Sequence, residues 1–438
     1  MELIQGLRLT RQTRAAFVGA GGKTTAVFQA ARQYNSRLLV TTTTHLSVDQ
    51  VGLADQHFSV RGAEDLPGKQ ELEGKVILFT GPEVEKGRVG PVNPTVLAAL
   101  RRQAEEGNCP LLLESDGARR LPLKAPADHE PPIPDFVNLV VVVAGLSGLG
   151  KPLNEQHVHR PEIFSRLSGL ERGAPVSSEG LLRVLTSDQG GLKDIPAQAR
   201  KVLLFNQIDA FPNWRKFHDF LPALHQHFHA VLFGTLEDEL LLETWERIAG
   251  VVLAAGGSSR FGETKQLLEW RGEPFIRVAA KKAIQAGLSP LVVVTGAERE
   301  AVSRALSDLQ VDTIYNPDWE TGQGSSVRAA VGSLPEGCGG AVFLLADQPQ
   351  IPVQVIEKLR AAHAGSLAPI TAVKVQGQRA NPVLFDRSLF SELIQITGDQ
   401  GGRALFDAYP LKYVSWEDPG ILLDVDVPED YQRLISRE

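Results

Sequence analysis

Short apolar runs recur along the whole chain and alternate with stretches of mixed polar and apolar residues. Runs rich in Val, Leu and Ile predict buried strands, and the stretches between them have the length and spacing of helices. In the first half the expected strands are 14–18, 37–41, 75–80, 110–114, 138–144 and 201–205. In the second half they are 249–254, 290–295, 341–346, 368–375, 382–386 and 420–424. The pattern predicts an α/β fold in which βαβ units build mainly parallel sheets.

The length of the chain indicates more than one domain, since 438 residues correspond to about two or three domains of ordinary size. Between the two sets of strands lies the segment EDELLLETWERIAG at 237–250, which we interpret as a charged amphipathic helix leading into the next strand. We therefore expect a boundary near residue 248 and two α/β domains, 1–247 and 248–438.

Composition narrows the class of protein. Hydrophobic residues make up 43% of the chain and charged residues 22%, as in soluble globular proteins. The net charge of −7 argues against a general attraction to nucleic acids or anionic membranes, so we expect small-molecule partners. Cys109 and Cys338 lie far apart and the longest apolar run, 139–144, is too short to span a bilayer, so a cytoplasmic location is expected.

The first half opens with AAFVGAGGKTT at 15–25, a glycine-rich loop between an expected strand and an expected helix. Backbone amides at a helix start favour phosphate, and a lysine followed by Thr24 or Thr25 suits a terminal phosphate and Mg²⁺, as in a P-loop. The full Walker pattern has glycine where this chain has Phe17, so the loop is a shortened form, and an ordinary glycine turn is the alternative. The candidate residues for binding ATP or GTP are Gly21, Gly22, Lys23, Thr24 and Thr25.

Carboxylates follow a later strand of the first half, in LLLESDG at 111–117. Glu114 and Asp116 are candidate Mg²⁺ ligands there, because strand-end carboxylates can hold the metal of a nucleotide site. Together with LPLKAPADHEPPIP at 121–134 and GLSGLGKPLNEQHVHRPE at 145–162, these segments resemble YqeC-type accessory proteins. The resemblance implies a P-loop-like nucleotide-binding domain that helps to mature a molybdenum hydroxylase, which would be a client protein.

The second half has its own glycine-rich loop, LAAGGSSRFGETKQLL at 253–268, directly after an apolar strand. Its glycines let a polyanion approach, and its Arg and Lys supply the charges that a triphosphate requires. The segment resembles the LAAGxSxRMGxxK signature of MobA/MocA-type nucleotidyltransferases, which implies a Rossmann-like nucleotidyltransferase domain. The candidate nucleotide-binding residues are Leu253, Ala254, Ala255, Gly256, Gly257, Ser258, Arg260, Lys265 and Ser325.

Nucleotidyl transfer also needs Mg²⁺ on negatively charged phosphates, and carboxylates normally hold that metal. Asp347 ends the apolar run AVFLLADQP, and Asp426 follows ILLDV. The same family has its metal-binding aspartates at these places, so we expect Asp347 and Asp426 to be ligands, with Asp424 as an alternative. The expected catalytic residues are Arg260, Lys265 and Asp347.

Three further segments resemble the acceptor side of the MocA-like branch: TGQGSSVRAAV at 321–331, RANPVLF at 379–385 and GDQGGRALF at 398–406. Ala255 matches the LAAG form of the branch that transfers cytidylyl groups, whereas the guanylyl-transferring branch has LAGG. The resemblance implies that CTP reacts with molybdenum-bound molybdopterin and releases pyrophosphate. Transfer from GTP, a sugar-phosphate acceptor and a non-catalytic cofactor chaperone remain alternatives. The expected acceptor-binding residues are Arg379, Asn381, Gly398 and Arg403.

Overall fold

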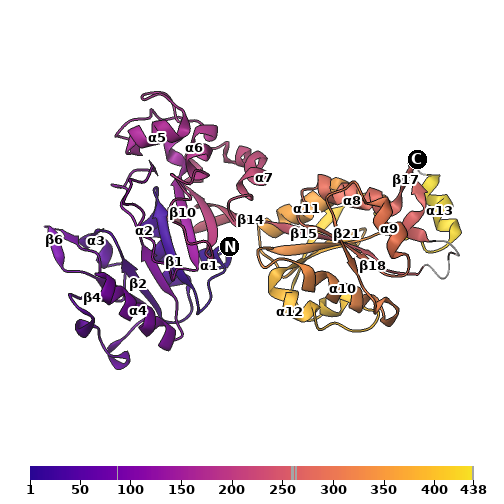
Figure 1. Cartoon of the computed structure of the whole chain (residues 1–438), viewed down its shortest axis with the longest axis horizontal. Helices are drawn as coiled ribbons and strands as arrows, with labels where there is room; N and C mark the ends of the chain where they lie inside the picture. The colour runs from indigo at the N-terminus through magenta and orange to yellow at the C-terminus, as the bar shows by residue number, and fades with distance from the viewer. Residues whose placement is uncertain (86, 258–260, 262–263, 437–438) are drawn as a thin grey trace. The chain divides into compact units, whose positions relative to one another are not determined.

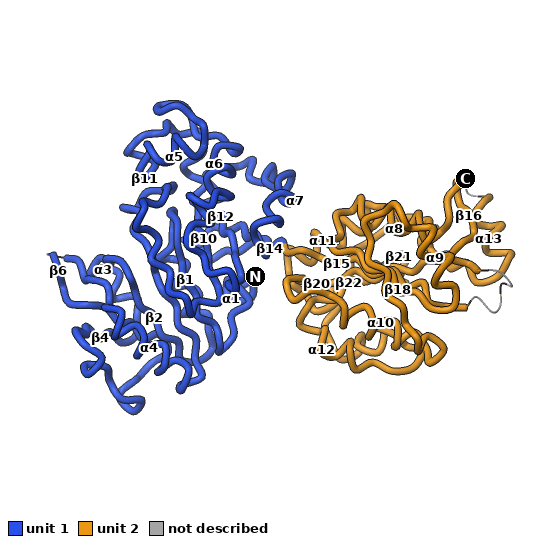
Figure 2. Tube along the Cα trace, in the orientation of Figure 1, with its two compact units in different colours: residues 1–245 blue, residues 246–438 orange. Residues whose placement is uncertain are grey.

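The computed structural model describes residues 1–438 except 86, 258–260, 262–263 and 437–438. It divides into two compact units, Met1–Trp245 and Glu246–Glu438, called here the N-terminal and C-terminal units (Figure 2). The division falls between Trp245 and Glu246, where the sequence pattern indicated a boundary near residue 248. A search of the described residues for a membrane-spanning helix, long and apolar enough to cross a bilayer, finds none.

The N-terminal unit is built on a sheet that contains nine strands among the described residues (Figure 1). Every neighbouring pair from β13 to β4 is parallel, which confirms the predicted α/β class. In spatial order the strands are β14 (Leu240–Glu246), β13 (Ala230–Thr235), β12 (Arg200–Asn206), β10 (Leu139–Gly145), β1 (Arg14–Gly19), β8 (Leu111–Glu114), β2 (Leu38–Thr42), β5 (Val76–Thr80) and β4 (Gln56–Ser59).

Both faces of this sheet are buried, as alternation along β1 shows. Ala15 and Phe17 pack into a core with helices α1 (Leu3–Leu7) and α2 (Lys23–Gln33). Ala16 and Val18 pack on the other face with α4 (Pro94–Glu106), α5 (Pro161–Ser168) and α6 (Ser178–Leu185). Smaller elements are β3 (Leu46–Ser47), α3 (Val48–Val51), β6 (Glu83–Glu85), β7 (Arg88–Val89), β9 (Leu123–Lys124), β11 (Val158–His159) and α7 (Leu221–Leu224). Parallel order places the loops after β1, β8 and β10 at one edge of the sheet.

The C-terminal unit has a sheet of seven strands among its described residues. In spatial order they are β19 (Asp312–Tyr315), β18 (Leu291–Thr295), β15 (Ile248–Ala254), β20 (Gly340–Leu345), β22 (Gln378–Asp386), β21 (Ile370–Val375) and β23 (Leu411–Trp416). β22 runs antiparallel to both of its neighbours, and the other pairs are parallel. A two-stranded pair, β16 (Glu269–Trp270) and β17 (Glu273–Pro274), lies outside this sheet.

Helices cover both faces of the C-terminal sheet as well. Val252 of β15 packs in a core with α8 (Phe275–Gln285), α9 (Arg299–Ala305) and α11 (Val353–Ala364). Val251 packs on the opposite face with α10 (Gln323–Ser333) and α12 (Phe390–Leu393), and α13 (Pro428–Ile435) belongs to a small separate core. The carboxyl ends of β15 and β20 are neighbours, so the loops that follow them meet.

Two expectations about elements are wrong. Residues 240–246 form the strand β14 rather than a helix, because Leu241 and Thr244 pack against Gly6 of α1 and against β13. Residues 420–424 form no strand. Residues Pro419–Leu422 form a short 3₁₀ helix instead, and the side chain of Asp418 caps it by accepting a hydrogen bond from the Gly420 N–H at 2.7 Å. The edge strands β4, β19 and β23 were missed, since short runs at sheet edges carry a weak apolar pattern, and the buried interior strand β13 was missed as well.

Candidate functional site

The glycine loop after β1 turns sharply into helix α2. Gly19, Gly21 and Gly22 have φ angles of 96°, 80° and 121°, a region that side chains with a Cβ rarely adopt. A Cβ on Gly21 would come within 2.8 Å of the backbone oxygen of Pro122, so the loop also packs closely on its neighbours. Glycine is therefore required both by conformation and by space.

The backbone amides of this loop fall into two groups. Those of Gly19, Ala20 and Gly21 already donate, to Asp116 Oδ2 at 3.1 Å, to Val143 O at 2.8 Å and to Leu121 O at 3.1 Å respectively. The N–H groups of residues 22–25 have no hydrogen-bond acceptor among the described residues. The helix start, rather than the whole loop, therefore offers free amides to an anion.

Lys23 and Thr24 point back toward the strand ends. Lys23 Nζ donates to Gly19 O at 2.7 Å and lies 3.2 Å from Asp116 Oδ1. Thr24 Oγ1 donates to Glu114 Oε2 at 2.7 Å and accepts from Gln50 Nε2 at 3.0 Å. Burial raises the pKa of Glu114, and the Lys23 charge and the Thr24 hydrogen bond oppose this. The structure thus brings Lys23, Thr24, Glu114 and Asp116 together, while Thr25 is exposed on α2.

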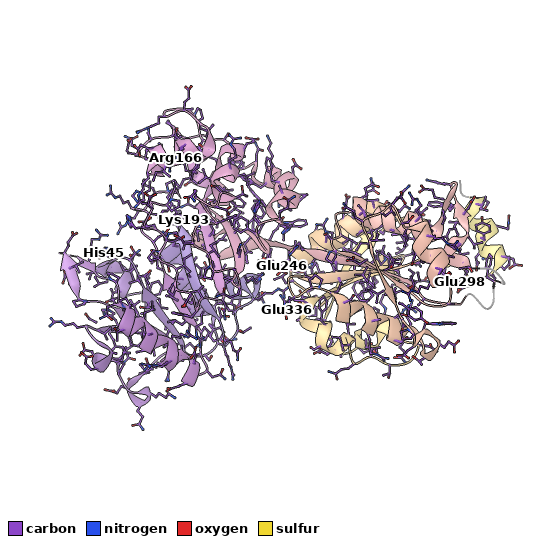
Figure 3. All side chains as sticks on the ribbon, viewed as in Figure 1. His45, Arg166, Lys193, Glu246, Glu298 and Glu336 are labelled. Carbon is purple, nitrogen blue, oxygen red and sulfur yellow. The ribbon has the colours of Figure 1, made fainter. Side chains whose placement is uncertain are left out.

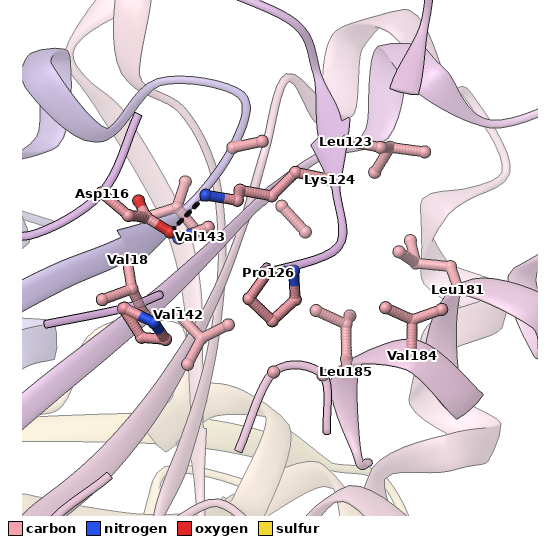
Figure 4. A pocket seen from close by; sticks show the side chains of 16 residues that line it. Val18, Asp116, Leu123, Lys124, Pro126, Val142, Val143, Leu181, Val184 and Leu185 are labelled. Carbon is pink, nitrogen blue, oxygen red and sulfur yellow. Dashed lines mark hydrogen bonds and ion pairs between the residues drawn. The ribbon is translucent and has the colours of Figure 1, made fainter. Parts of the chain in front are cut away.

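Asp116 is engaged from several sides. Its Oδ2 accepts from Lys124 Nζ at 2.7 Å (Figure 4). The same oxygen accepts from the Gly19 N–H of the loop at 3.1 Å. Both lysines near it are almost fully buried, at 5% and 3% side-chain exposure for Lys23 and Lys124. Asp116 could ligate a metal only by giving up part of this network, whereas Glu114 carries a single hydroxyl contact.

Polar side chains at the ends of β12 and β2 form hydrogen bonds with backbone groups of neighbouring segments in the N-terminal unit. Asn206 Nδ2 donates to Gly21 O at 2.8 Å, and its Oδ1 accepts from Leu236 N at 2.9 Å. Thr41 Oγ1 donates to Phe79 O at 3.0 Å, and Thr42 Oγ1 donates to Thr44 O at 2.9 Å. These side chains fix the loops around the site.

The C-terminal unit has an open cleft of about 460 Å³ at the carboxyl ends of β15 and β20. Of the expected nucleotide-binding residues, Leu253, Ala255, Gly256 and Lys265 line it. Ala254 is buried at the end of β15, and Ser258 and Arg260 lie outside the described residues. Asp347 and Asp426 line the same cleft, so the two expected metal ligands and the loop share one cavity.

Lys265 lies between the two aspartates. Its Nζ is 2.8 Å from Asp426 Oδ1 and 3.3 Å from Asp347 Oδ2. Burial opposes its charge, but the hydrogen bond and charge of Asp426 and the charge of Asp347 raise the pKa of Lys265. Burial also raises the pKa of Asp347, with the Lys265 charge opposing and the charges of Asp424 and Asp426 adding to it.

The pair of aspartates fits a divalent cation. Asp347 Oδ1 is buried and has no hydrogen-bond partner among the described residues, and such a carboxylate oxygen is a good ligand for Mg²⁺. No group of three or more His, Cys, Asp or Glu side chains that could hold a metal occurs in the described part of the chain. A cation at this site would therefore need further ligands from water or substrate phosphates.

Neighbouring side chains hold the glycine loop of the C-terminal unit. Gln266 Nε2 donates to Gly256 O at 2.8 Å. The indole of Trp319 fills the space beside two glycines, since a Cβ on Gly257 or Gly296 would lie 2.9 Å or 2.8 Å from it. Trp319 also lines the cleft, so it shapes the loop and the cavity together.

The serines that begin α10 have different roles. Ser325 Oγ donates to Gly322 O at 2.8 Å and accepts from Asn316 Nδ2 at 2.8 Å, so the expected nucleotide contact is used within the protein. Ser326, its neighbour, lines the cleft although Asn316 also contacts it, at 3.0 Å.

A second cavity of about 380 Å³ contains most of the expected acceptor residues. Arg379, Asn381 and Arg403 line it, and Gly398 does not; its carbonyl accepts from Gly324 N–H at 2.9 Å. Asp424 lines this cavity and accepts from Gln348 Nε2, rather than facing the cleft with Asp347.

Several contacts could not be foreseen from spacing, because their partners are distant in the sequence. They include Gln50 on Thr24, Trp319 against the glycine loop, and the links of Glu130 to Lys124 and Arg160. The residues around Glu130 show no sequence pattern that predicts these contacts, although the segment 121–134 resembles YqeC-type proteins. Figure 3 shows all described side chains, with His45 of the N-terminal unit and Glu298 before α9 labelled for orientation.

The C-terminal unit thus combines a mixed α/β sheet with a glycine loop and two aspartates in one cleft, and it is joined to a second, parallel α/β unit. The family model described as YqeC protein matches residues 15–162, and that described as MobA-like NTP transferase domain matches residues 250–413. The chain belongs to the YqeC family through its N-terminal unit and to the MobA-like NTP transferases through its C-terminal unit.

Individual relatives match one unit each. "Uncharacterized protein YqeC" of Escherichia coli K12 is 31% identical over 236 residues, 52% of this chain and 89% of that protein. "Purine catabolism protein PucB" of Bacillus subtilis 168 is 31% identical over 195 residues, 42% of this chain and 94% of that protein. "Molybdenum cofactor cytidylyltransferase" of E. coli K12 is 28% identical over 188 residues, 41% of this chain and 92% of that protein.

Proposed function

We propose that the C-terminal unit transfers a cytidylyl group from CTP to molybdenum-bound molybdopterin and releases pyrophosphate. The observation that carries this proposal is the convergence of Asp347, Asp426 and Lys265 in one cleft beneath the glycine loop. The cytidylyltransferase relative, 28% identical over 92% of its own length, supports the choice of base and acceptor.

Nucleotidyl transfer requires stabilisation of the negative charge on the phosphates, and it requires no nucleophile from the protein. A phosphate oxygen of the acceptor attacks the α-phosphorus of CTP, and the bond to pyrophosphate breaks. Mg²⁺ bound at Asp347 and Asp426 would supply positive charge for the phosphates. Lys265 would add a fixed charge at the same place, and burial strengthens its interaction with the phosphates by excluding water.

Most of the remaining expected site residues keep their proposed roles. Leu253, Ala255, Gly256, Gly257, Ser258 and Arg260 would bind the nucleotide, and Arg379, Asn381 and Arg403 the acceptor. Ala254 and Gly398, expected to bind the nucleotide and the acceptor, would instead support these loops, since Ala254 is buried and Gly398 does not line the acceptor cavity. The placement of Arg379, Asn381 and Arg403 around a cavity of about 380 Å³ supports an acceptor site separate from the nucleotide cleft. Ser326, which lines the cleft, is a better candidate for nucleotide contact than Ser325.

The test is pyrophosphate release by the full chain with Mg²⁺, molybdenum cofactor and CTP, GTP or UTP side by side. We expect turnover with CTP to exceed that with the other two nucleotides. Preference for GTP, or turnover only with a sugar phosphate in place of the cofactor, would contradict the proposal. It would indicate that the unit is a nucleotidyltransferase with another nucleotide or another acceptor. Cofactor binding with no pyrophosphate release from any nucleotide would favour a chaperone.

For the N-terminal unit we propose Mg²⁺-dependent binding of ATP or GTP, in support of maturation of a molybdenum hydroxylase in the cytoplasm. The free amides at residues 22–25, with Lys23 and the Thr24–Glu114 contact beside them, support this proposal. Calorimetry of the full chain with each nucleotide tests it. We expect a heat of nucleotide binding that is smaller in the Lys23→Ala variant than in the parent. An equal heat of binding in the two proteins would indicate that the loop is only a structural turn.

A further inference from the structure

The acceptor cavity of the C-terminal unit, of about 380 Å³, contains an acidic side chain beside basic ones. Within the part of the chain that the structure describes, the charged residues that line it are Arg379, Arg403 and Asp424. The two arginines suit the phosphate of an acceptor, because a guanidinium matches phosphate oxygens. A carboxylate repels a phosphate, so Asp424 has no use in a site that binds phosphate alone.

Asp424 is held at the cavity by two neighbouring side chains. Gln348 Nε2 donates to Asp424 Oδ1. Gln350 Nε2 donates to Leu423 O at 2.5 Å, and this bond fixes the backbone directly before Asp424. Asp424 is exposed, and its second carboxylate oxygen, Oδ2, has no hydrogen-bond or ion-pair partner among the described residues. The cavity therefore has an oriented carboxylate with one oxygen available to a ligand.

Gln348 adds a second acceptor beside this carboxylate. The residue is only 5% exposed, and its Nε2 faces Asp424, so its Oε1 lies on the other side of the amide. This oxygen is buried without a hydrogen-bond partner among the described residues, although Gln348 lines the cavity. A buried acceptor that lacks a donor costs free energy, which an N–H group of a ligand would recover. Asp424 and Gln348 thus offer acceptors to a ligand that carries donors.

A smaller pocket of about 50 Å³ lies between the acceptor cavity and the nucleotide cleft. It shares Leu253 and Leu345 with the cleft, and Asn381 and Arg403 with the acceptor cavity. Of these three hollows in the described structure, Asp424 lines the acceptor cavity alone. A ligand whose phosphate passes Arg403 toward the cleft would therefore have its other end at Asp424.

We propose that Asp424 and Gln348 select the acceptor by accepting hydrogen bonds from a ring that carries an amino group beside a ring N–H. Such an edge can donate two parallel hydrogen bonds to one carboxylate, as a guanidinium does. The pterin ring of the proposed acceptor has this edge, whereas a sugar phosphate has hydroxyl groups in its place. This recognition deepens the proposed transfer reaction and rests on it for the identity of the acceptor.

The test is the binding of two fluorescent compounds, pterin-6-carboxylate and lumazine-6-carboxylate, to the full chain at pH 7. They have nearly the same shape, but the 2-amino group of the pterin is a carbonyl in the lumazine. Fluorescence titration gives both dissociation constants without CTP and without turnover. We expect the pterin to bind at least about tenfold more tightly, because the lumazine carbonyl would face the Asp424 carboxylate.

Asp424→Asn should bring the two dissociation constants within about threefold of each other, because an amide can donate to the lumazine carbonyl as well as accept from the pterin. Asp407→Asn is the matched control and should keep the preference of the parent. Asp407 is an exposed aspartate of the same unit that lines none of the three hollows. Gln348→Met, which has a similar volume and no amide, should weaken binding of the pterin more than that of the lumazine.

Equal binding of both compounds to the parent, or an unchanged preference in Asp424→Asn, would overturn the proposal. Unchanged constants in Gln348→Met would remove Gln348 from it. The titrations are repeated with EDTA in place of Mg²⁺, and a preference that needs the metal would overturn direct recognition by Asp424.

Pyrophosphate release from CTP and molybdenum cofactor, measured on the same samples, tests the transfer reaction separately. A preference for the pterin without transfer from CTP would remove the proposed function and leave this recognition site. Transfer from CTP without a preference for the pterin would do the reverse.

Discussion

At each of the two candidate sites, a lysine lies next to aspartate side chains of opposite charge. Substituting one member of such a pair tests its contribution to binding or catalysis. Lys265 lies between Asp347 and Asp426, and Lys23 lies beside Asp116. In each case the lysine keeps a carboxylate in place when no phosphate is bound. A phosphate would compete with the carboxylate for the same ammonium group.

Asp347→Asn should remove Mg²⁺-dependent transfer without unfolding the C-terminal unit. The side chain keeps nearly the same shape, so only the charge is lost, and loss of such a charge lowers kcat by about two to three orders of magnitude. Steady-state pyrophosphate release measures kcat, and the melting temperature serves as control. Turnover within a few-fold of the parent would show that the metal lies elsewhere.

Ala255→Gly should raise use of GTP relative to CTP. Ala255 lines the nucleotide cleft, and one methyl group in a pocket is worth about 1–3 kcal/mol of discrimination. The ratio of kcat/KM for the two nucleotides is the measurement. An unchanged ratio would exclude Ala255 as a determinant of base choice.

Glu130 should make the N-terminal unit sensitive to acid. Burial opposes its ionisation, but hydrogen bonds from Arg160 and Lys124 lower the pKa of Glu130 to about 2. A carboxyl with a lowered pKa stabilises the fold fully above its ordinary pKa near 4.5, and this contribution disappears as the pH falls toward 2. A shift of this size corresponds to about 3 kcal/mol.

Denaturant unfolding of the parent and Glu130→Gln at pH 7 and pH 3 measures this contribution. The difference in unfolding free energy between the two proteins should be larger at pH 7. A difference that is the same at both pH values would contradict the ion-pair explanation.

At the scale of elements, the sequence predicted most central strands and the glycine loops but not the edge strands or the interior strand β13. Buried parallel strands are continuous apolar runs, so β1, β8, β10, β15 and β20 were evident. β14 was mistaken for a helix, since its charged residues hide a strand that is stabilised by β13 and by Gly6 of α1. Contacts between distant residues, such as those of Glu130, have no local signal.

Trp319 should act as a support for the nucleotide loop of the C-terminal unit. It fills the space that Gly257 and Gly296 leave open, so its loss would let the loop move and weaken nucleotide binding. Trp319→Ala should raise KM for CTP about tenfold, whereas Trp319→Phe should retain most of the affinity. Equal KM values for the parent and Trp319→Ala would show that the indole does not contribute to nucleotide binding through the loop.

At the scale of the whole molecule, each unit has its own sheet, cores and candidate site. Separately expressed chains of residues 1–245 and 246–438 should therefore each fold, and the second should keep CTP binding when the first is absent. Calorimetry with CTP and with ATP on each chain is the measurement. An aggregated or unfolded segment would show that one unit needs the other for stability.

The units divide after Trp245, within β14, and only Arg247 separates the end of β14 at Glu246 from the start of β15 at Ile248. The Arg247 carbonyl accepts from Gly339 N–H at 2.9 Å, and the strands on both sides are held in sheets. Proteases need an extended stretch of accessible chain, which such a junction does not provide. The two proposed activities would consequently stay together in a one-to-one ratio, because both sites belong to one chain.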